Sequence, residues 1–421
     1  MPERRPRGNI APALPTRPLA ADPWLKTHLG ARALGLRAAL AVPHDVFSTQ
    51  RIDEGTLLLL AHLPPCEPGE VLDLGCGYGA LGLPVAARHP RARVEMVDRD
   101  LLAVAWAEQN ARALGLANAE IHPSLGYRDL ARTPGGPPRA YDWILCNVPA
   151  RIGAPFVAHL CAGGRARLAP GGEVRLVVIR DLAPLVAAVA AAHGWPLAEG
   201  AAGPRHQVLA LPAPAARRLE PLAPEPADLY LRDTVEVAGL ALERPFDLGG
   251  DDPRRLDHGL PVLLDVLPRQ APQRVLCFRA GYGALPLVAR TRWPGAEVVT
   301  VERDLLGAEF LRRNAARVGL DGARLELRMA AHVPDALRPD ERFDLALGEL
   351  SPAAGERVAH AELAALARHL EPGGQALCLA VEKLAREWLG RDRALPVSLQ
   401  RLIARQGYVV VRVGREKRAR S

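Results

Sequence analysis

A glycine-rich loop flanked by two acids has the composition of a nucleoside-binding site. Residues 71–79 read Val-Leu-Asp-Leu-Gly-Cys-Gly-Tyr-Gly, so that Asp73 precedes Gly75, Gly77 and Gly79. Glycines permit a tight turn between a strand and a helix and let a ligand approach the backbone closely. Asp98 ends the next apolar segment, where a carboxylate accepts hydrogen bonds from ribose hydroxyls. This combination favours a bound nucleoside over a turn that serves packing alone.

The spacing of the glycines distinguishes two families of nucleoside-binding proteins. A dinucleotide fingerprint has the form Gly-x-Gly-x-x-Gly, whereas Gly79 comes one residue early and Gly82 three residues later. Asp-Leu-Gly-Cys-Gly-Tyr-Gly instead resembles motif I of class I S-adenosylmethionine-dependent methyltransferases, whose two acids match Asp73 and Asp98. The resemblance implies S-adenosylmethionine as the cofactor. It places Asp73 and the glycine loop at the methionine end and Asp98 at the ribose.

A second motif, Asn147-Val148-Pro149-Ala150, follows the apolar segment 143–146. It resembles the Asn-Pro-Pro-aromatic motif of methyltransferases that modify exocyclic amines, and this implies catalytic roles for Asn147 and Pro149. An aromatic amine is a poor nucleophile because its lone pair is delocalised. The Asn side-chain oxygen and the next backbone carbonyl can accept its two N–H bonds, so catalysis is mainly positioning. The alternative is that Asn147 only caps a turn, but its place after the glycine loop favours the catalytic interpretation.

This motif departs from the family pattern at two positions. Val148 replaces the first proline, and Ala150 replaces the aromatic residue, which would stack on the target base. Such stacking contributes ~1–3 kcal/mol per base. Phe156 and Trp143 are the nearest substitutes, although core packing explains each of them better.

The segment Phe47-Ser48-Thr49-Gln50-Arg51-Ile52-Asp53-Glu54-Gly55-Thr56 is similar to the entry segment of the RsmC/RlmG group of ribosomal RNA guanine-N2 methyltransferases. In that group two copies of the fold are joined in one chain, and one copy is degenerate. The resemblance implies that Phe47, Ser48, Gly55 and Thr56, together with Ala150, line the cofactor or substrate mouth. The alternative for Thr56 is an ordinary helix N-terminus.

The chain contains the same pattern twice. Residues 275–283 read Val-Leu-Cys-Phe-Arg-Ala-Gly-Tyr-Gly and repeat residues 71–79 at a distance of 204 residues. The same distance separates Asp53 from Asp257, Asp98 from Glu302, Asp100 from Asp304, and Asn110 from Asn314. A series of matches at one distance indicates an internal duplication.

The second copy lacks the residues that would bind a ligand. Cys277 replaces the first acid, and Arg279 replaces the first glycine, so that its side chain should obstruct the ligand space. Glu349 stands where the first copy has Asn147. Glu302 survives and could still meet a ribose, but we expect it to be a surface acid beside Arg303. The usual order in the RsmC/RlmG group, a degenerate copy followed by an active one, is therefore reversed here.

Apolar segments alternate with helical patterns in both copies. The predicted strands are 71–74, 94–97, 143–146 and 173–179 in the first copy, and 275–278, 298–301, 345–347 and 375–381 in the second. The predicted helices are 80–88, 101–114 and 305–318, with a core helix at 182–192 and a helical lead-in within 21–45. A β-hairpin is predicted from residue 229. This alternation predicts an α/β fold of two tandem Rossmann-like class I methyltransferase domains, each with a doubly wound, mostly parallel sheet.

Chain length and composition indicate the domain organisation and argue against a metal site. A chain of 421 residues suits two domains. We predict an N-terminal extension at 1–45, a catalytic domain at 46–211, a proline-rich linker at 212–228 and a degenerate domain at 229–421. The six cysteines show no Cys-x-x-Cys spacing, which argues against a metal site and favours a reducing compartment. No signal peptide or membrane-spanning run is recognisable, so we expect a cytoplasmic protein.

The net charge of +7 is concentrated partly in the tails. They contain Arg4, Arg5, Arg7 and Arg17 at one end, and Arg412, Arg415, Lys417, Arg418 and Arg420 at the other. Basic tails can follow a phosphate backbone, but charge alone favours solvated tails. The sequence thus predicts a methyltransferase acting on RNA, at guanine N2 of ribosomal RNA, as a monomer with an internal pseudo-dimer. Adenine N6, a protein glutamine, and a non-catalytic RNA-binding scaffold are the alternatives.

Overall fold

A computed structural model describes residues 22–213 except 65 and 131–138, residues 228–246, and residues 254–415 except 321, 323, 352, 354 and 390–396. The predicted disordered segment 1–20, most of the proline-rich linker and the last residues of the basic tail lie outside this part of the chain. The described residues fall into two compact units. One contains Lys26–Leu231, and the other contains the hairpin Arg232–Pro245 and the second copy of the repeat.

The first unit is built on a seven-stranded sheet with the order β5-β4-β3-β6-β7-β9-β8. The strands are β3 (Glu70–Leu74), β4 (Arg93–Asp98), β5 (Ala119–Pro123), β6 (Tyr141–Asn147), β7 (Leu168–Ile179), β8 (Ala198–Ala202) and β9 (His206–Pro212). The first five pair in parallel, and β9 runs antiparallel between β7 and β8. The mostly parallel, doubly wound sheet predicted from the sequence is confirmed.

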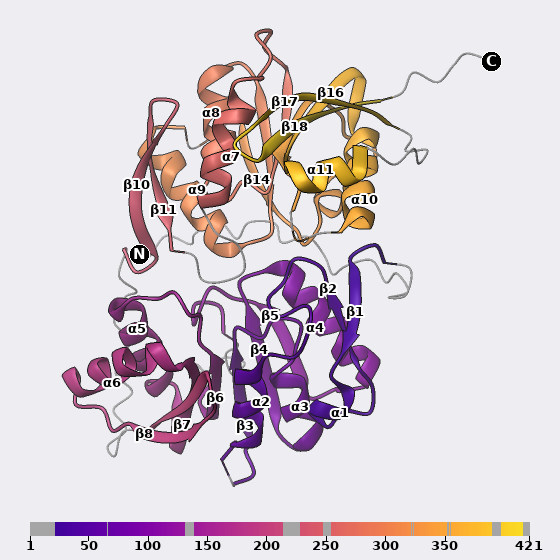
Figure 1. Ribbon diagram of the computed structural model, residues 1–421. Helices are drawn as coiled ribbons and strands as arrows, with labels where there is room; N and C mark the ends of the chain where they lie inside the picture. Colours follow the sequence, from indigo (N-terminus) through magenta and orange to yellow (C-terminus); the bar gives the residue numbers. More distant parts are fainter. Residues whose placement is uncertain are drawn as a thin grey trace. The chain divides into compact units, whose positions relative to one another are not determined.

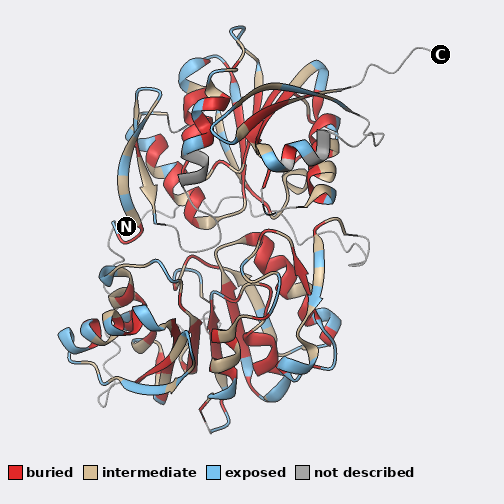
Figure 2. Cartoon of the chain, viewed as in Figure 1, coloured by how far each residue is buried: buried red, intermediate tan, exposed pale blue. Residues whose placement is uncertain are grey.

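Helices cover this sheet (Figure 1). They are α2 (Glu54–Ala61), α3 (Gly82–Arg88), α4 (Leu101–Leu114), α5 (Ala154–Arg165) and α6 (Ala183–Ala192), with a 3-10 turn at Arg180–Leu182. Figure 2 shows the central strands as the most buried part of the unit. Helix α4 begins at Asp100, whose side chain accepts a hydrogen bond from Leu102 N, and ends at Gly115 in the left-handed region. These caps explain why both of its ends could be predicted from the sequence.

The second unit repeats this plan with the strand order β14-β13-β12-β15-β16-β18-β17. Its strands are β12 (Arg274–Phe278), β13 (Glu297–Glu302), β14 (Leu325–Met329), β15 (Phe343–Glu349), β16 (Leu370–Val381), β17 (Val397–Arg405) and β18 (Tyr408–Arg415). Its helices are α7 (Arg254–Leu264), α8 (Ala284–Arg292), α9 (Leu305–Arg317), α10 (Glu356–Arg368) and α11 (Glu382–Leu389), with a 3-10 turn at Val333–Ala336. The identical order of equivalent strands confirms the duplication.

Each unit also has a two-stranded sheet. The predicted hairpin is confirmed as β10 (Leu231–Val237) and β11 (Leu240–Pro245). The helical lead-in predicted within 21–45 is wrong, because this segment forms β1 (Leu25–Leu29), β2 (Leu40–Pro43) and only a four-residue helix, α1 (Ala31–Leu34). Glycines at both ends of α1 stop it, and the high Ala and Leu content concealed the strands.

A buried asparagine attaches the second strand of each pair to its unit. Asn110 Oδ1 accepts a hydrogen bond from Ala41 N at 2.8 Å, and its Nδ2 donates to Ala41 O and Tyr78 O, both at 2.9 Å. Asn314 makes the same three bonds with Glu243 and Tyr282. The conserved offset of these asparagines therefore reflects a structural role. Within the described residues, no helix is both long and apolar enough to cross a membrane.

Candidate active site

The strand order brings the predicted site residues to one edge of the first sheet. Strand β3 lies between β4 and β6 and is parallel to both. The glycine loop after β3 therefore lies between Asp98, at the end of β4, and Asn147, at the end of β6. Neighbouring strands are roughly 4.8 Å apart. Ligands of open α/β sheets bind outside these carboxyl ends, so the position suits a ligand site.

The first two loop glycines leave space for a ligand. Gly75 (φ 83°) and Gly77 (φ 55°) have left-handed backbones, and a Cβ added to either would meet no atom within 4 Å. Gly79 is different, since a Cβ there would overlap the side chain of Leu83 at the start of α3. Gly75 and Gly77 thus form the open face of the loop, while Gly79 lets α3 pack closely against it.

Asp73 is a buried carboxylate with one oxygen left for a ligand. Its side chain is 1% exposed, and Oδ2 accepts a hydrogen bond from Gly82 N at 2.7 Å. Oδ1 is buried and has no hydrogen-bond partner among the described residues. Burial, together with the nearby charge of Asp98, raises the pKa of Asp73 to about 7. Such a carboxylate fits a cation, and the ammonium group of a methionine moiety supplies one.

Asp98 holds the glycine loop. Oδ2 accepts a hydrogen bond from Gly77 N and Oδ1 one from Asp100 N, both at 2.9 Å. A carboxylate has about four lone-pair sites, so a half-buried Asp98 can also accept ribose hydroxyls. The donors and acceptors at this edge therefore fit S-adenosylmethionine. Within the part of the chain that the structure describes, no group of three or more His, Cys, Asp or Glu side chains could hold a metal.

The side-chain amide nitrogen of Asn147 is hydrogen-bonded to two residues at the start of α2. Nδ2 donates to Asp53 Oδ2 at 2.8 Å and to Thr56 Oγ1 at 3.1 Å. The structure therefore brings together Asn147 and Thr56, which the sequence singled out, with Asp53, which it did not. The only signal for Asp53 was its helix N-cap position and its recurrence in the repeat. Its carboxylate indeed caps α2 by accepting from Thr56 N at 3.1 Å.

The departures from the amine motif have structural counterparts. Val148 is buried and donates its backbone N–H to Val177 O at 2.9 Å, a bond that a proline could not make. Pro149 is half-buried, and Ala150 is exposed beside it. Trp143 is 1% exposed and belongs to the core. Phe156 packs against Tyr230 with ring centroids 5.8 Å apart, so neither aromatic side chain lies open for stacking.

The entry segment is attached to the glycine loop. Tyr78 donates its hydroxyl to the backbone oxygen of Ser48 at 3.2 Å. Ser48 has a left-handed backbone (φ 58°), and its own hydroxyl donates to Arg51 O at 2.5 Å. Phe47, the preceding residue, is 60% exposed, which is unusual for so large an apolar side chain. Phe47 and Ser48 therefore stand beside the loop with the Phe47 ring in solvent.

Side chains fill the corresponding space in the second unit. Arg279 keeps the left-handed backbone of the glycine it replaces (φ 50°) and donates to Glu362 Oε1 at 2.9 Å. Its guanidinium lies over the ring of Trp24, 5.6 Å from the centroid, and Trp24 contacts the ring of His332 at 4.8 Å. Cys277, in place of the first acid, is fully buried. The predicted obstruction by Arg279 is thus accompanied by a tryptophan that the sequence did not suggest.

The expectation that Glu302 is a surface acid is wrong. It is 5% exposed, and burial raises its pKa. Oε2 accepts from Gly281 N at 2.8 Å, and Oε1 accepts from Asp304 N at 3.0 Å. Glu302 therefore does for the second loop what Asp98 does for the first, and it is retained because it supports the loop backbone.

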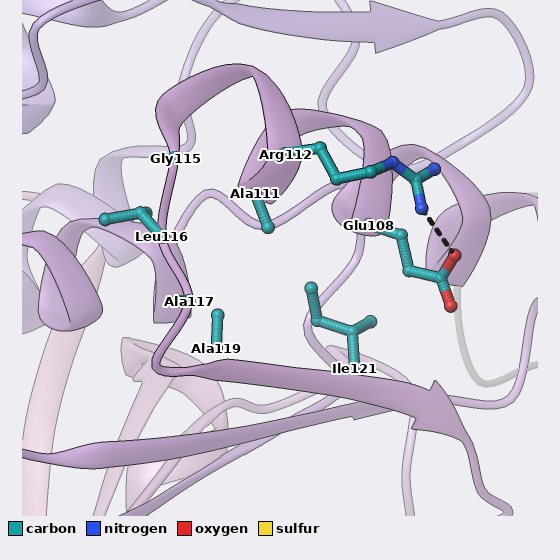
Figure 3. Close-up of a pocket in the computed structure, with 8 residues that line it drawn as sticks. All are labelled: Glu108, Ala111, Arg112, Gly115, Leu116, Ala117, Ala119 and Ile121. Atoms are coloured by element: carbon teal, nitrogen blue, oxygen red, sulfur yellow. Dashed lines mark ion pairs between the residues drawn. The ribbon is translucent and has the colours of Figure 1, made fainter. Parts of the chain in front are cut away.

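A surface hollow of about 460 Å³ lies elsewhere in the first unit. Figure 3 shows it between the end of α4 and the start of β5, with an ion pair of 3.6 Å between Glu108 and Arg112 at its rim. Its other lining residues are Ala111, Gly115, Leu116, Ala117, Ala119 and Ile121. The start of β5 is at the edge of the sheet opposite the glycine loop, so this hollow is not part of the candidate site.

Comparison with known proteins agrees with the duplicated architecture. The model of the family described as "Methyltransferase small domain" matches residues 38–187 and again 253–411. The chain is 37% identical over 136 residues to the ribosomal RNA small subunit methyltransferase C of Pseudomonas entomophila, covering 31% of this chain and 39% of that protein. It is 32% identical over 147 residues to the ribosomal RNA large subunit methyltransferase G of Cronobacter sakazakii, covering 33% of this chain and 37% of that protein. These matches span less than half of the curated relatives.

A solved structure resembles nearly the whole chain. It is the T. thermophilus 16S rRNA N2 methyltransferase RsmC in complex with AdoMet and guanosine, with a TM-score of 0.62 and 23% identity. The match covers 94% of this chain and 100% of that one. At this identity the likeness establishes the fold of both units.

Proposed function

Because the chain belongs to the methyltransferase small domain family, which matches both of its halves, we propose that it is an S-adenosylmethionine-dependent methyltransferase. Its substrate is RNA, at the exocyclic N2 amine of a guanine in ribosomal RNA. Residues 46–211 form the catalytic domain, and residues 229–421 form a non-catalytic domain that helps to hold RNA. One observation carries the proposal: the amide nitrogen of Asn147 is fixed by a hydrogen bond to Asp53, next to a glycine loop with space for a ligand.

The cofactor site uses the acids and the open glycines. Asp73 would hold the methionine ammonium group through Oδ1, Asp98 would hold the ribose hydroxyls, and Gly75 and Gly77 would let the ligand approach their backbone. When bound, S-adenosylmethionine supplies its sulfonium methyl group to the amine nitrogen, and S-adenosylhomocysteine and a proton leave. The attacking nucleophile in this step is the amine nitrogen of the substrate, so the described residues contribute by binding and orienting the two reactants.

Asn147 orients the substrate amine. Its Nδ2 is engaged by Asp53 and Thr56, so Oδ1 remains to accept one amine N–H, while the carbonyl of Val148 accepts the other. These two bonds direct the nitrogen lone pair at the methyl group, which makes positioning the main contribution to the rate. The Pro149 ring stiffens the chain at this point.

RNA as the substrate is supported by charge and by the relatives. The net charge of +7 favours a polyanion, and the matched curated proteins are named as ribosomal RNA methyltransferases. A base in a duplex cannot reach the end of the sheet, so the target is single-stranded or flipped out. We propose a monomer that works in the cytoplasm on ribosomal RNA or a ribosomal subunit.

Methylation mapping of ribosomal RNA from a deletion strain tests the proposal. We expect the loss of one N2-methylguanine, its return with the wild-type gene, and no return with Asn147→Ala. Loss of N6-methyladenine or of a methylated protein glutamine instead would identify a different amine as the substrate. The observation that favours a different amine is the exposed Ala150, which stands in place of a base-stacking aromatic residue. No change in any methylated product would favour a non-catalytic RNA-binding scaffold.

A further inference from the structure

Asn147 can act on an amine only if its oxygen, and not its nitrogen, faces the substrate. Building on the proposed function, we propose that Asp53 is a positioning residue that fixes this orientation. The carboxylate of Asp53 holds Nδ2 of Asn147 at 2.8 Å and thereby turns Oδ1 toward the amine. Asp53 itself contacts neither the cofactor nor the reacting atoms.

The chemistry of the two contacts assigns this role to Asp53 and not to Thr56. A hydroxyl both donates and accepts, so Thr56 Oγ1, at 3.1 Å, would accommodate either end of the amide. An ionised carboxylate only accepts, so the group that faces Asp53 must be the NH2. In the flipped amide a donor would face the N–H bonds of the substrate, and the lone pair would lose its direction.

The packing of α2 places Asp53 within reach of β6. A Cβ on Gly55 would lie 2.8 Å from Asp53 Oδ2, 2.9 Å from His206 Cδ2 and 3.2 Å from Val177 Cγ2. Glycine therefore lets the first turn of α2 lie this close to β7 and β9 without displacing these side chains. The carboxylate stays fixed because the same Oδ2 accepts from Thr56 N at 3.1 Å as the helix N-cap.

Two substitutions separate positioning from helix capping. Serine caps helices about as well as aspartate, but its shorter side chain cannot also reach Asn147 Nδ2. Asparagine caps equally well, and the capping bond from Thr56 N requires its oxygen, not its NH2, at the position of Asp53 Oδ2, so it restores the acceptor. Asp53→Ser should therefore lower turnover, and Asp53→Asn should largely rescue it, while both keep the stability of the wild type. Asp142→Asn is a matched control, because Asp142 accepts from Gly69 N and Glu70 N at the opposite edge of the sheet.

Methyl transfer is measured with full-length protein, labelled S-adenosylmethionine and ribosomal subunits from the deletion strain. We expect Asp53→Ser to lower kcat about tenfold to a hundredfold, the range of a lost charge-assisted hydrogen bond. The dissociation constant of S-adenosylmethionine and the thermal midpoint should stay unchanged. Asp53→Asn should lie within about fivefold of the wild type, and Asp142→Asn at the wild-type rate.

A second measurement follows the hydrogen bond of the Asn147 side-chain amide directly. In protein with isotope-labelled asparagine, the side-chain NH2 signal of Asn147 is identified by its absence in Asn147→Ala. It should move when Asp53→Ser is introduced and return toward its wild-type position in Asp53→Asn. Equal kcat in the serine and asparagine variants, or an unmoved signal, overturns the inference. If the wild type transfers no methyl group to any of the subunits, the proposed function fails instead, and the signal alone still tests the contact.

Discussion

Asp73 allows a quantitative test of the proposed cofactor site. A buried carboxylate that is suited to a cation should lower the free energy of unfolding when no cation is bound. Its pKa lies at about 7 instead of the ordinary 3.8, as a result of burial. The difference of about three pH units, at about 1.4 kcal/mol for each, amounts to about 4 kcal/mol of lost stability above pH 7. Asp73→Asn removes this charge but leaves a buried N–H without a partner, at a cost of about 1–3 kcal/mol.

The net expectation for Asp73→Asn at pH 8 is a gain of about 1–3 kcal/mol in the free energy of unfolding of the first unit. For a domain of this size, roughly 2–4 °C in the thermal midpoint accompanies each kcal/mol. The native carboxyl keeps a proton that the unfolded chain releases between about pH 4 and pH 7. The Asp73 contribution therefore lowers wild-type stability as the pH rises through this window, and this contribution is absent from the variant. The gain should shrink as the pH falls from 7 toward 4.

Thermal unfolding of both proteins at pH 8 and pH 4.5, without ligand, measures this difference. Titration with S-adenosylmethionine should show that the stabilised variant has lost at least tenfold in affinity. A variant that is less stable than the wild type at pH 8, or a stability difference independent of pH, would refute the reasoning about Asp73. Unchanged affinity would remove this residue from the cofactor site.

Three further expectations follow from the geometry. Phe47→Ala should raise KM for RNA about tenfold in steady-state assays, because a stacked base contributes ~1–3 kcal/mol, and the thermal midpoint should change little. An unchanged KM would count against the exposed ring as a base contact. Asn110→Ala should destabilise the first unit by about 3 kcal/mol in urea unfolding, because three buried backbone bonds are lost; a loss below about 1 kcal/mol would contradict it. The double change Cys277→Asp and Arg279→Gly should not create a second cofactor site in calorimetry, because the ring of Trp24, which contacts Arg279 and His332, remains in the second unit. A second site would show that Cys277 and Arg279 alone silence this copy.

The sequence was most informative where local rules and the repeat agreed. Helix α4 had a capping aspartate, an apolar face and a terminal glycine, and its observed limits are those predicted. Most of the parallel strands were apolar runs that precede loops or helices, whereas β5 and β14 are not apolar runs and were not predicted. Strands β8 and β9 were not foreseen, because β8 is mostly small and exposed, and its pairing with β9 depends on contacts made only in the folded sheet.

Residues whose roles depend on distant neighbours could not be found from the sequence. Asp53 meets Asn147 across 94 residues, and Trp24 meets Arg279 across 255. Glu302 was misjudged because an acid beside an arginine is typical of a surface. Only the folded structure shows that Glu302 is buried and accepts a hydrogen bond from Gly281 N in the loop. Motifs thus pointed to the candidate site, and the folded structure added the residues that contact it and those that contact Arg279 in its copy.

Calorimetric titration of S-adenosylmethionine into the wild type and into Asp98→Ala tests the central claim most directly. The account predicts one site per chain in the wild type and none in the variant, because only the first copy has an open loop between Asp98 and Asn147. Two sites in the wild type, or one undiminished site in the variant, would contradict it.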